Sequence, residues 1–149
     1  MKILDFTTEE LCEQPRLRIG LVTETWPPEV NGVAMTLKRM VDGLIERGHS
    51  VQLVRPRQAP NDVPTQAHGL DELLARGVSL PRYDGLKLGL PARARLVREW
   101  SHQRPDLVHV ATEGPLGWTA VTAANKLRLP VTSDFHTNFD HYSSHYGVG

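Results

Sequence analysis

The fold is decided by residues 18–54, which read RIGLVTETWPPEVNGVAMTLKRMVDGLIERGHSVQLV. The run 18–22 is short and apolar, as expected of a strand that is covered on both faces. A second run of this kind follows at 51–54. Between them, apolar residues recur at helical spacing before Gly48 ends the pattern; they are Val33, Leu37, Met40, Val41 and Leu44. Strand, helix and strand in this order predict a right-handed βαβ unit, and therefore a parallel sheet.

The second half of the chain continues this alternation. Residues 106–110 and 130–134 are strand-like apolar runs, and predicted helices precede and follow the first of them. Pro91 begins one of these helices, which extends to about Gln103, and Pro115 takes the first position of the other. The pattern predicts a doubly wound, mainly parallel, Rossmann-like α/β sheet of about five or six strands.

The middle of the chain has a weaker pattern. Residues 55–77 contain three prolines and a single apolar cluster within 70–74, which predicts a surface excursion with one or two helical turns. Residues 78–80 and 86–88 are predicted short strands joined by a turn.

The composition excludes several classes of protein. The chain of 149 residues carries 17 Lys+Arg and 17 Asp+Glu, so no net charge attracts nucleic acid. No apolar run reaches about 18 residues, so no segment is predicted to span a membrane. Residues 1–16 are an acidic segment without a signal-peptide core, and they predict a flexible N-terminal lead on a cytoplasmic protein. Residues 17–149 then form one domain, and the single Cys12 excludes a disulfide framework.

Three predicted loops follow strands at the same edge of the sheet: 24–33, 111–114 and 135–138. Loops at the carboxyl ends of parallel strands line the ligand crevice of an open α/β sheet. In the first loop, Gly32 lets the backbone approach a ligand where a helix begins and unpaired N–H groups attract anions. A rigid connector explains the first loop alone equally well. The residues predict an α/β domain that binds a polar, anionic ligand.

Two other ligand sites fit the sequence less well. The first loop has one glycine, Gly32, where a dinucleotide fingerprint needs three, so Arg55 and Arg57 are weak candidates for an NADP site. His141 and His145 are four residues apart and can share a helix face, but no glutamate base lies between them. A surface pair is therefore favoured over a zinc site.

Two further features of the sequence leave more than one interpretation open. His136 directly follows the last predicted strand, where an imidazole can bind a substrate hydroxyl or stabilise charge; a core histidine fits as well. Arg93, Arg95 and Arg98 are better explained by a solvated helix face than by an anion site. Together with Trp26, this helix is a candidate for peripheral contact with the inner face of a membrane.

Three segments of the chain carry a more specific pattern. They read TETWPPEVNGV at 23–33, PDLVHV followed by TEGPLG within 105–117, and SDFHTNF at 133–139. In this order and spacing they resemble the N-terminal domain of a family 4 (group 1) glycosyltransferase with the GT-B fold. The resemblance covers residues from about Arg18 to the end of the chain.

The resemblance implies retaining transfer of a hexose from a nucleotide sugar to a glycan or lipid acceptor, without a cofactor or a metal. GDP-mannose and UDP-hexoses are both compatible donors, and mannose is the favoured hexose. By match, His136 contacts the donor sugar near the reacting centre and is the predicted catalytic residue. The predicted substrate-binding residues are Asn31, Gly32, Val33, Glu113, Gly114, Thr137 and Asn138. Among them, the glycine loop would lie against the donor phosphates and the acceptor, and Thr137 on the acceptor side.

The chain departs from this family in one large respect. Family members have a second Rossmann-like domain, which binds the nucleotide and carries a Glu-x₇-Glu signature and a basic phosphate clamp. The 149 residues contain no such domain, so we expect a fragment, or a chain completed by a partner, that is inactive alone. Two alternatives stay open: a non-catalytic carbohydrate- or nucleotide-binding module of this fold, and a metal-dependent hydrolase using His136, His141 and His145.

Overall fold

The structure is a computed structural model that describes residues 15–79, 81 and 87–134. Its elements in chain order are β1 (Arg18–Val22), α1 (Gly32–Glu46), β2 (Ser50–Pro56), β3 (Gln66–Ala67), β4 (Leu70–Ala75), β5 (Gly77–Ser79), β6 (Lys87–Gly89), α2 (Arg93–His102), β7 (Leu107–Val110), α3 (Pro115–Lys126) and β8 (Val131–Ser133). A six-stranded sheet has the order β3-β4-β2-β1-β7-β8, and every pairing is parallel except that of β3 with β4. The predicted doubly wound, mainly parallel sheet is confirmed.

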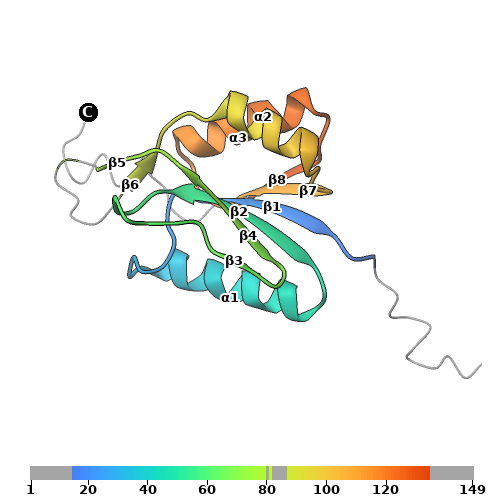
Figure 1. The fold of residues 1–149 in the computed structure, drawn as a ribbon, viewed down its shortest axis with the longest axis horizontal. Helices are drawn as coiled ribbons and strands as arrows, with labels where there is room; N and C mark the ends of the chain where they lie inside the picture. Colours follow the sequence, from blue (N-terminus) through green and yellow to red (C-terminus); the bar gives the residue numbers. More distant parts are fainter. Residues whose placement is uncertain (1–14, 80, 82–86, 135–149) are drawn as a thin grey trace, which may run out of the picture.

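The helices form one layer on each face of the sheet. Figure 1 shows α1 alone on one face and α2 beside α3 on the other. On the first face, Leu37 and Val41 of α1 pack against Leu21 and Leu53 of the sheet. On the second face, Trp100 of α2 and the alanines of α3 pack against the valines of the central strands; the buried residues of this cluster include Val22, Val54, Val108, Ala120, Ala123 and Ala124. Apolar burial on both faces explains why the strands read as continuous apolar runs.

The predicted βαβ unit of residues 18–54 is also confirmed. Asn31 caps α1, because its side-chain Oδ1 accepts the backbone N–H of Ala34 at 2.8 Å. At the other end of the helix, Gly48 has a φ of 88° and donates its N–H to the carbonyl of Ile45 at 2.9 Å. This left-handed conformation favours glycine, so Gly48 stops the helix for the reason expected.

The prediction for residues 55–77 is wrong in its main point. Residues 70–75 form β4, which pairs in parallel with β2, and they do not form helical turns on a surface excursion. The strand was hidden in the sequence because Glu72 interrupts its apolar pattern. Glu72 is nevertheless buried, since it pairs with Arg55 of the neighbouring strand at 3.0 Å. A buried charge is tolerated only with such a partner, and the local sequence does not show the partner.

The remaining predicted elements are close to the observed ones. The two short strands predicted around residues 78–80 and 86–88 pair antiparallel as β5 and β6. The helix predicted from Pro91 starts instead at Arg93, after the N-cap Ala92. The helix after residue 114 has Pro115 at its first turn, as expected.

Candidate functional site at the carboxyl edge of the sheet

The first two predicted loops lie side by side at the carboxyl ends of β1 and β7. These strands are parallel neighbours, and Val22 is paired with Val110 at their ends. Beyond the strands, the backbone N–H of Glu24 donates to the hydroxyl of Thr112 at 2.7 Å, which ties one loop to the other. The third predicted loop, with His136, Thr137 and Asn138, lies outside the described residues.

The amino end of α1 is open. A Cβ atom placed on Gly32 would meet nothing within 4 Å. The Asn31 side chain is occupied, since it accepts from Ala34 and donates its Nδ2 to the hydroxyl of Thr25 at 2.7 Å. Thr25 in turn donates to the Glu29 carboxylate at 2.5 Å. The loop therefore holds its own shape and leaves space beside the first N–H groups of the helix, where an anionic group is favoured.

Trp26 lies inside the protein. Its side chain is 5% exposed and packs with Leu37, Val41 and Ala111. Its backbone carbonyl accepts the N–H of Glu29 at 3.1 Å within the loop. The expectation that Trp26 touches a membrane surface is therefore wrong, because the loop folds its indole back onto α1.

The amino end of α3, in contrast, is filled by a side chain of the protein. Glu24 is 7% exposed, and its carboxylate accepts the N–H of Leu116 at 3.1 Å and the N–H of Gly89. Burial raises the pKa of Glu24 above its ordinary value, while the N–H groups of Gly89, Leu116 and Gly117 act in the opposite direction. Glu24 thus joins β1, β6 and α3 at one point, and it complements the positive end of the α3 dipole.

Glycines around Glu24 make this close packing possible. A Cβ atom on Gly114 would collide with the carboxylate of Glu24, and a Cβ on Gly117 would lie 2.7 Å from the carbonyl oxygen of Thr112. Gly89 is equally confined, since its Cβ would lie 2.9 Å from the same carboxylate. Glu113, in the same loop, is exposed. The contact of Glu113 and Gly114 with substrate stays a prediction. Sequence reasoning missed Glu24, although a carboxylate two residues after a buried strand was a visible signal.

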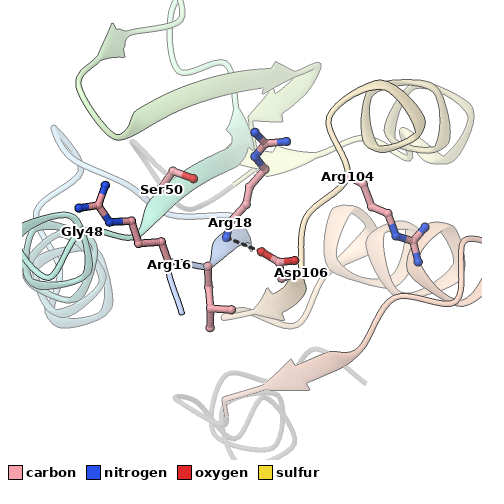
Figure 2. Close-up of a pocket in the computed structure, with 7 residues that line it drawn as sticks. Arg16, Arg18, Gly48, Ser50, Arg104 and Asp106 are labelled. Atoms are coloured by element: carbon pink, nitrogen blue, oxygen red, sulfur yellow. Dashed lines mark hydrogen bonds between the residues drawn. The ribbon is translucent and has the colours of Figure 1, made fainter. Parts of the chain in front are cut away.

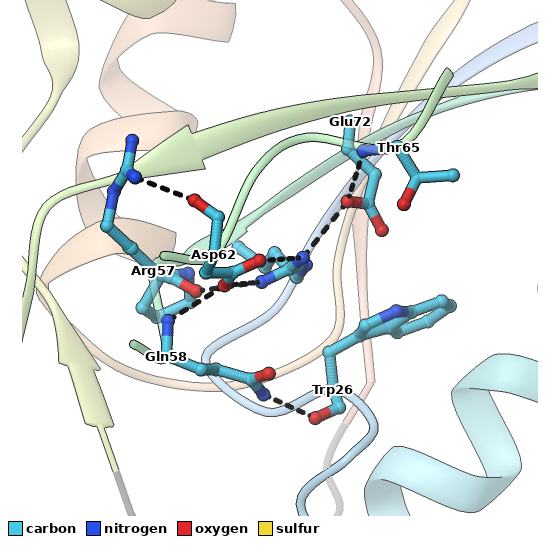
Figure 3. A network of polar contacts seen from close by, with 8 residues as sticks. Trp26, Arg57, Gln58, Asp62, Thr65 and Glu72 are labelled. Carbon is cyan, nitrogen blue, oxygen red and sulfur yellow. Dashed lines mark hydrogen bonds and ion pairs between the residues drawn. The ribbon is translucent and has the colours of Figure 1, made fainter. Parts of the chain in front are cut away.

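A buried polar network supports the first loop from the side of β2 (Figure 3). Arg55 binds both carboxylate oxygens of Asp62, at 2.7 and 3.0 Å, and also binds Glu72 at 3.0 Å. Arg55 holds the pKa of Asp62 below its ordinary value. The next residues continue the network, because the Gln58 side chain donates to the carbonyl of Trp26 at 2.5 Å. Arg55 is therefore engaged by protein carboxylates, which argues against its role as an NADP ligand.

Sequence reasoning also missed a group of side chains on β7 and β8. The ring nitrogens of His109 lie 2.8 Å from the Thr132 hydroxyl and 3.0 Å from the Asp134 carboxylate. The parallel register places His109 opposite Thr132, and Asp134 directly follows β8. The group binds the two strands together, and residues 135–138, which include His136, follow in the sequence.

The arginines of α2 behave as a mostly solvated face. Arg93, Arg95 and Arg98 are exposed, as predicted for a solvated helix face. Arg95 nevertheless donates its Nη1 to the carbonyl of Leu74 at 2.5 Å, which ties α2 to β4.

Comparison with known proteins matches this fold to a family. Residues 30–148, most of the chain, match the model of Glycosyltransferase Family 4. The chain belongs to glycosyltransferase family 4. Its sheet and helices correspond to the N-terminal Rossmann-like half of a GT-B glycosyltransferase, as the resemblance implied. A sucrose-phosphate synthase structure from Thermosynechococcus elongatus shares this fold, with a TM-score of 0.54 and 15% identity over 82% of this chain and 33% of that one.

Several glycosyltransferases are similar to this chain in sequence. A GDP-mannose-dependent alpha-mannosyltransferase of Mycolicibacterium smegmatis is 31% identical over 136 residues, which cover 89% of this chain and 36% of the relative. An alpha-monoglucosyldiacylglycerol synthase of Acholeplasma laidlawii is 28% identical, with 87% of this chain and 32% of the relative covered. The chain thus spans about a third of the length of the curated relatives it matches.

Proposed function

We propose that this chain forms the acceptor-side part of a retaining hexosyltransferase, which moves a hexose from a nucleotide sugar to a glycan or lipid acceptor. GDP-mannose is the proposed donor, supported by relatives named GDP-mannose-dependent alpha-mannosyltransferase. A lipid acceptor is supported by relatives named alpha-monoglucosyldiacylglycerol synthase.

The open amino end of α1 is the observation that carries this proposal. No protein nucleophile is proposed for this transfer, so the protein must act by positioning the substrates and by stabilising the charge of the leaving phosphate. The site therefore needs a place that favours this negative charge. A Cβ atom on Gly32 would meet nothing within 4 Å apart from its chain neighbours, and the bonds of Asn31 hold the helix start in position. At α3 the corresponding position is occupied by Glu24, whose negative charge would repel a phosphate. Asn31, Gly32 and Val33 are therefore the proposed phosphate-side residues.

His136 is the proposed catalytic residue, and Thr137 and Asn138 are proposed to bind substrate. Support comes from β8, which is the parallel neighbour of β7 and whose carboxyl end opens on the same edge as residues 24–33 and 111–114. Residues 135–138 follow this strand directly.

The nucleotide pocket is proposed to come from a second domain or a partner chain, so residues 1–149 alone would be inactive.

We propose a cytoplasmic location with peripheral membrane contact, supported by the exposed Arg93 and Arg98 of α2 and by Trp118 of α3, which is 68% exposed. No helix in the described residues is long and apolar enough to cross a membrane.

The test uses this chain combined with a donor-binding domain that restores mannosyl transfer. In that active preparation, Gly32→Trp fills the space beside α1 and should reduce kcat/KM by about a hundredfold or more. Val30→Trp is the matched control, because Val30 is 94% exposed in the same loop and should tolerate the added bulk. Full activity of Gly32→Trp would return the loop to the role of a connector. If this chain binds the donor but no added donor-binding domain restores mannosyl transfer, a non-catalytic binding module is favoured.

A further inference from the structure

The opposite, amino-terminal edge of the sheet contains a cavity of ≈ 470 Å³ (Figure 2). It lies where β1, β2 and β7 begin, and it is lined by Arg16, Leu17, Arg18, Gly48, Ser50, Arg104 and Asp106. Amino and carboxyl ends of parallel strands lie on opposite edges, so this cavity is separate from the proposed transferase site. The cavity is open to solvent, and its charged residues Arg16, Arg18, Arg104 and Asp106 are exposed.

The lining of this cavity is strongly basic in a chain whose net charge is zero. It contains three arginines and one carboxylate. That carboxylate, on Asp106, accepts the backbone N–H of Arg18 at 2.8 Å and so has a role in holding the start of β1. Within the described part of the chain, none of the side chains of Arg16, Arg18 and Arg104 forms an ion pair with a carboxylate. The cavity therefore retains positive charge that protein carboxylates do not neutralise.

The directions of the arginines indicate the shape of a suitable ligand. In Figure 2 the guanidinium groups of Arg16, Arg18 and Arg104 spread to different sides of the cavity and do not converge on one point. Groups that spread in this way favour a ligand with several separated phosphates over a single phosphate, although Arg104 also donates to the carbonyl of Arg128 at 3.4 Å. Guanidinium groups bind phosphate oxygens through paired, charge-assisted hydrogen bonds. Ser50 adds a hydroxyl to the same lining.

We propose that this cavity is a second ligand site, which binds a small polyanion carrying two or more phosphate groups. The proposal does not depend on the transferase function, because it uses different residues at a different edge of the sheet. Its charges are exposed, so binding should weaken as salt is added.

The test is calorimetric titration of the purified chain with inorganic tripolyphosphate, at low and at physiological ionic strength. We expect saturable binding of tripolyphosphate that depends on the arginines of this cavity. The double variant Arg18→Ala/Arg104→Ala should weaken it by about tenfold, as expected for two exposed charge pairs. Inorganic monophosphate should bind more weakly than tripolyphosphate, and equal binding would contradict the multi-phosphate class of ligand.

Two control variants make the result specific. Arg93→Ala/Arg98→Ala removes the same charge from the exposed face of α2 and should leave the affinity nearly unchanged. Gly32→Trp blocks the open end of α1 and should also have no effect on tripolyphosphate binding. Absence of saturable binding, an equal loss in the two arginine variants, or loss in Gly32→Trp would each overturn the inference. Circular dichroism of each variant verifies that it is folded.

Discussion

Replacement of Glu24 by alanine should destabilise the protein far more than its position in a loop indicates. The Glu24 carboxylate accepts two backbone N–H groups, from Gly89 and Leu116, which are separated from it by 65 and 92 residues. The variant leaves both donors without their acceptor in a buried place, at a cost of about 1–3 kcal/mol for each group. Removal of a buried charge offsets part of this loss. We therefore expect the free energy of unfolding to fall by about 2–4 kcal/mol.

Urea unfolding of the purified chain, followed by circular dichroism, measures this change. Glu113→Ala is the matched control, because Glu113 is an exposed glutamate in the adjoining loop and its loss should cost less than about 0.5 kcal/mol. Equal midpoints for Glu24→Ala and wild type, at an unchanged slope, would refute the idea that Glu24 holds β1, β6 and α3 together.

The pH dependence of the same residue gives an independent measurement. The pKa of Glu24 is raised by burial above its ordinary value of 4.5, so the folded state holds the proton more tightly than the unfolded state. Protonation of Glu24 therefore stabilises the folded state, and this stabilisation is complete below pH 4.5. The stabilisation is lost as the pH rises through the folded-state pKa of Glu24. Compared with Glu24→Ala, the wild type should lose stability over that interval. An identical pH profile for the two proteins would contradict the assigned burial.

Two further predictions concern the framework of the fold. The pKa of Asp62 is lowered from 3.8 by Arg55, so its stabilisation is complete above pH 3.8 and is lost as pH falls through the folded-state pKa. Asp62→Asn should therefore differ from wild type at neutral pH and converge with it in acid, which acid–urea titration can measure. Gly48→Ala should cost about 1 kcal/mol, because φ is 88° there. Gly32→Ala, in open space, should be nearly neutral in thermal unfolding.

The local pattern was sufficient for the first strand, the first helix and the second strand. Their apolar spacing and the stop at Gly48 are properties of neighbouring residues, and the structure confirms them. The local pattern failed for residues 70–75, because burial of Glu72 depends on Arg55 in another strand. It failed also for Trp26, whose side chain is buried against Leu37 and Val41 of α1.

For the candidate site, the sequence by itself determined that the loops after β1 and β7 share the carboxyl edge, because parallel βα units place them there regardless of packing detail. The third predicted loop, 135–138, lies outside the described residues. The tertiary structure alone decided which helix start is open. The amino ends of α1 and α3 are preceded by asparagine and glycine, yet only α3 is filled by a distant side chain, that of Glu24. At α1 the local Asn31 side chain caps Ala34, and the space at Gly32 stays open. Satisfaction of buried N–H groups depends on partners far away along the chain, and only the folded chain brings such partners together.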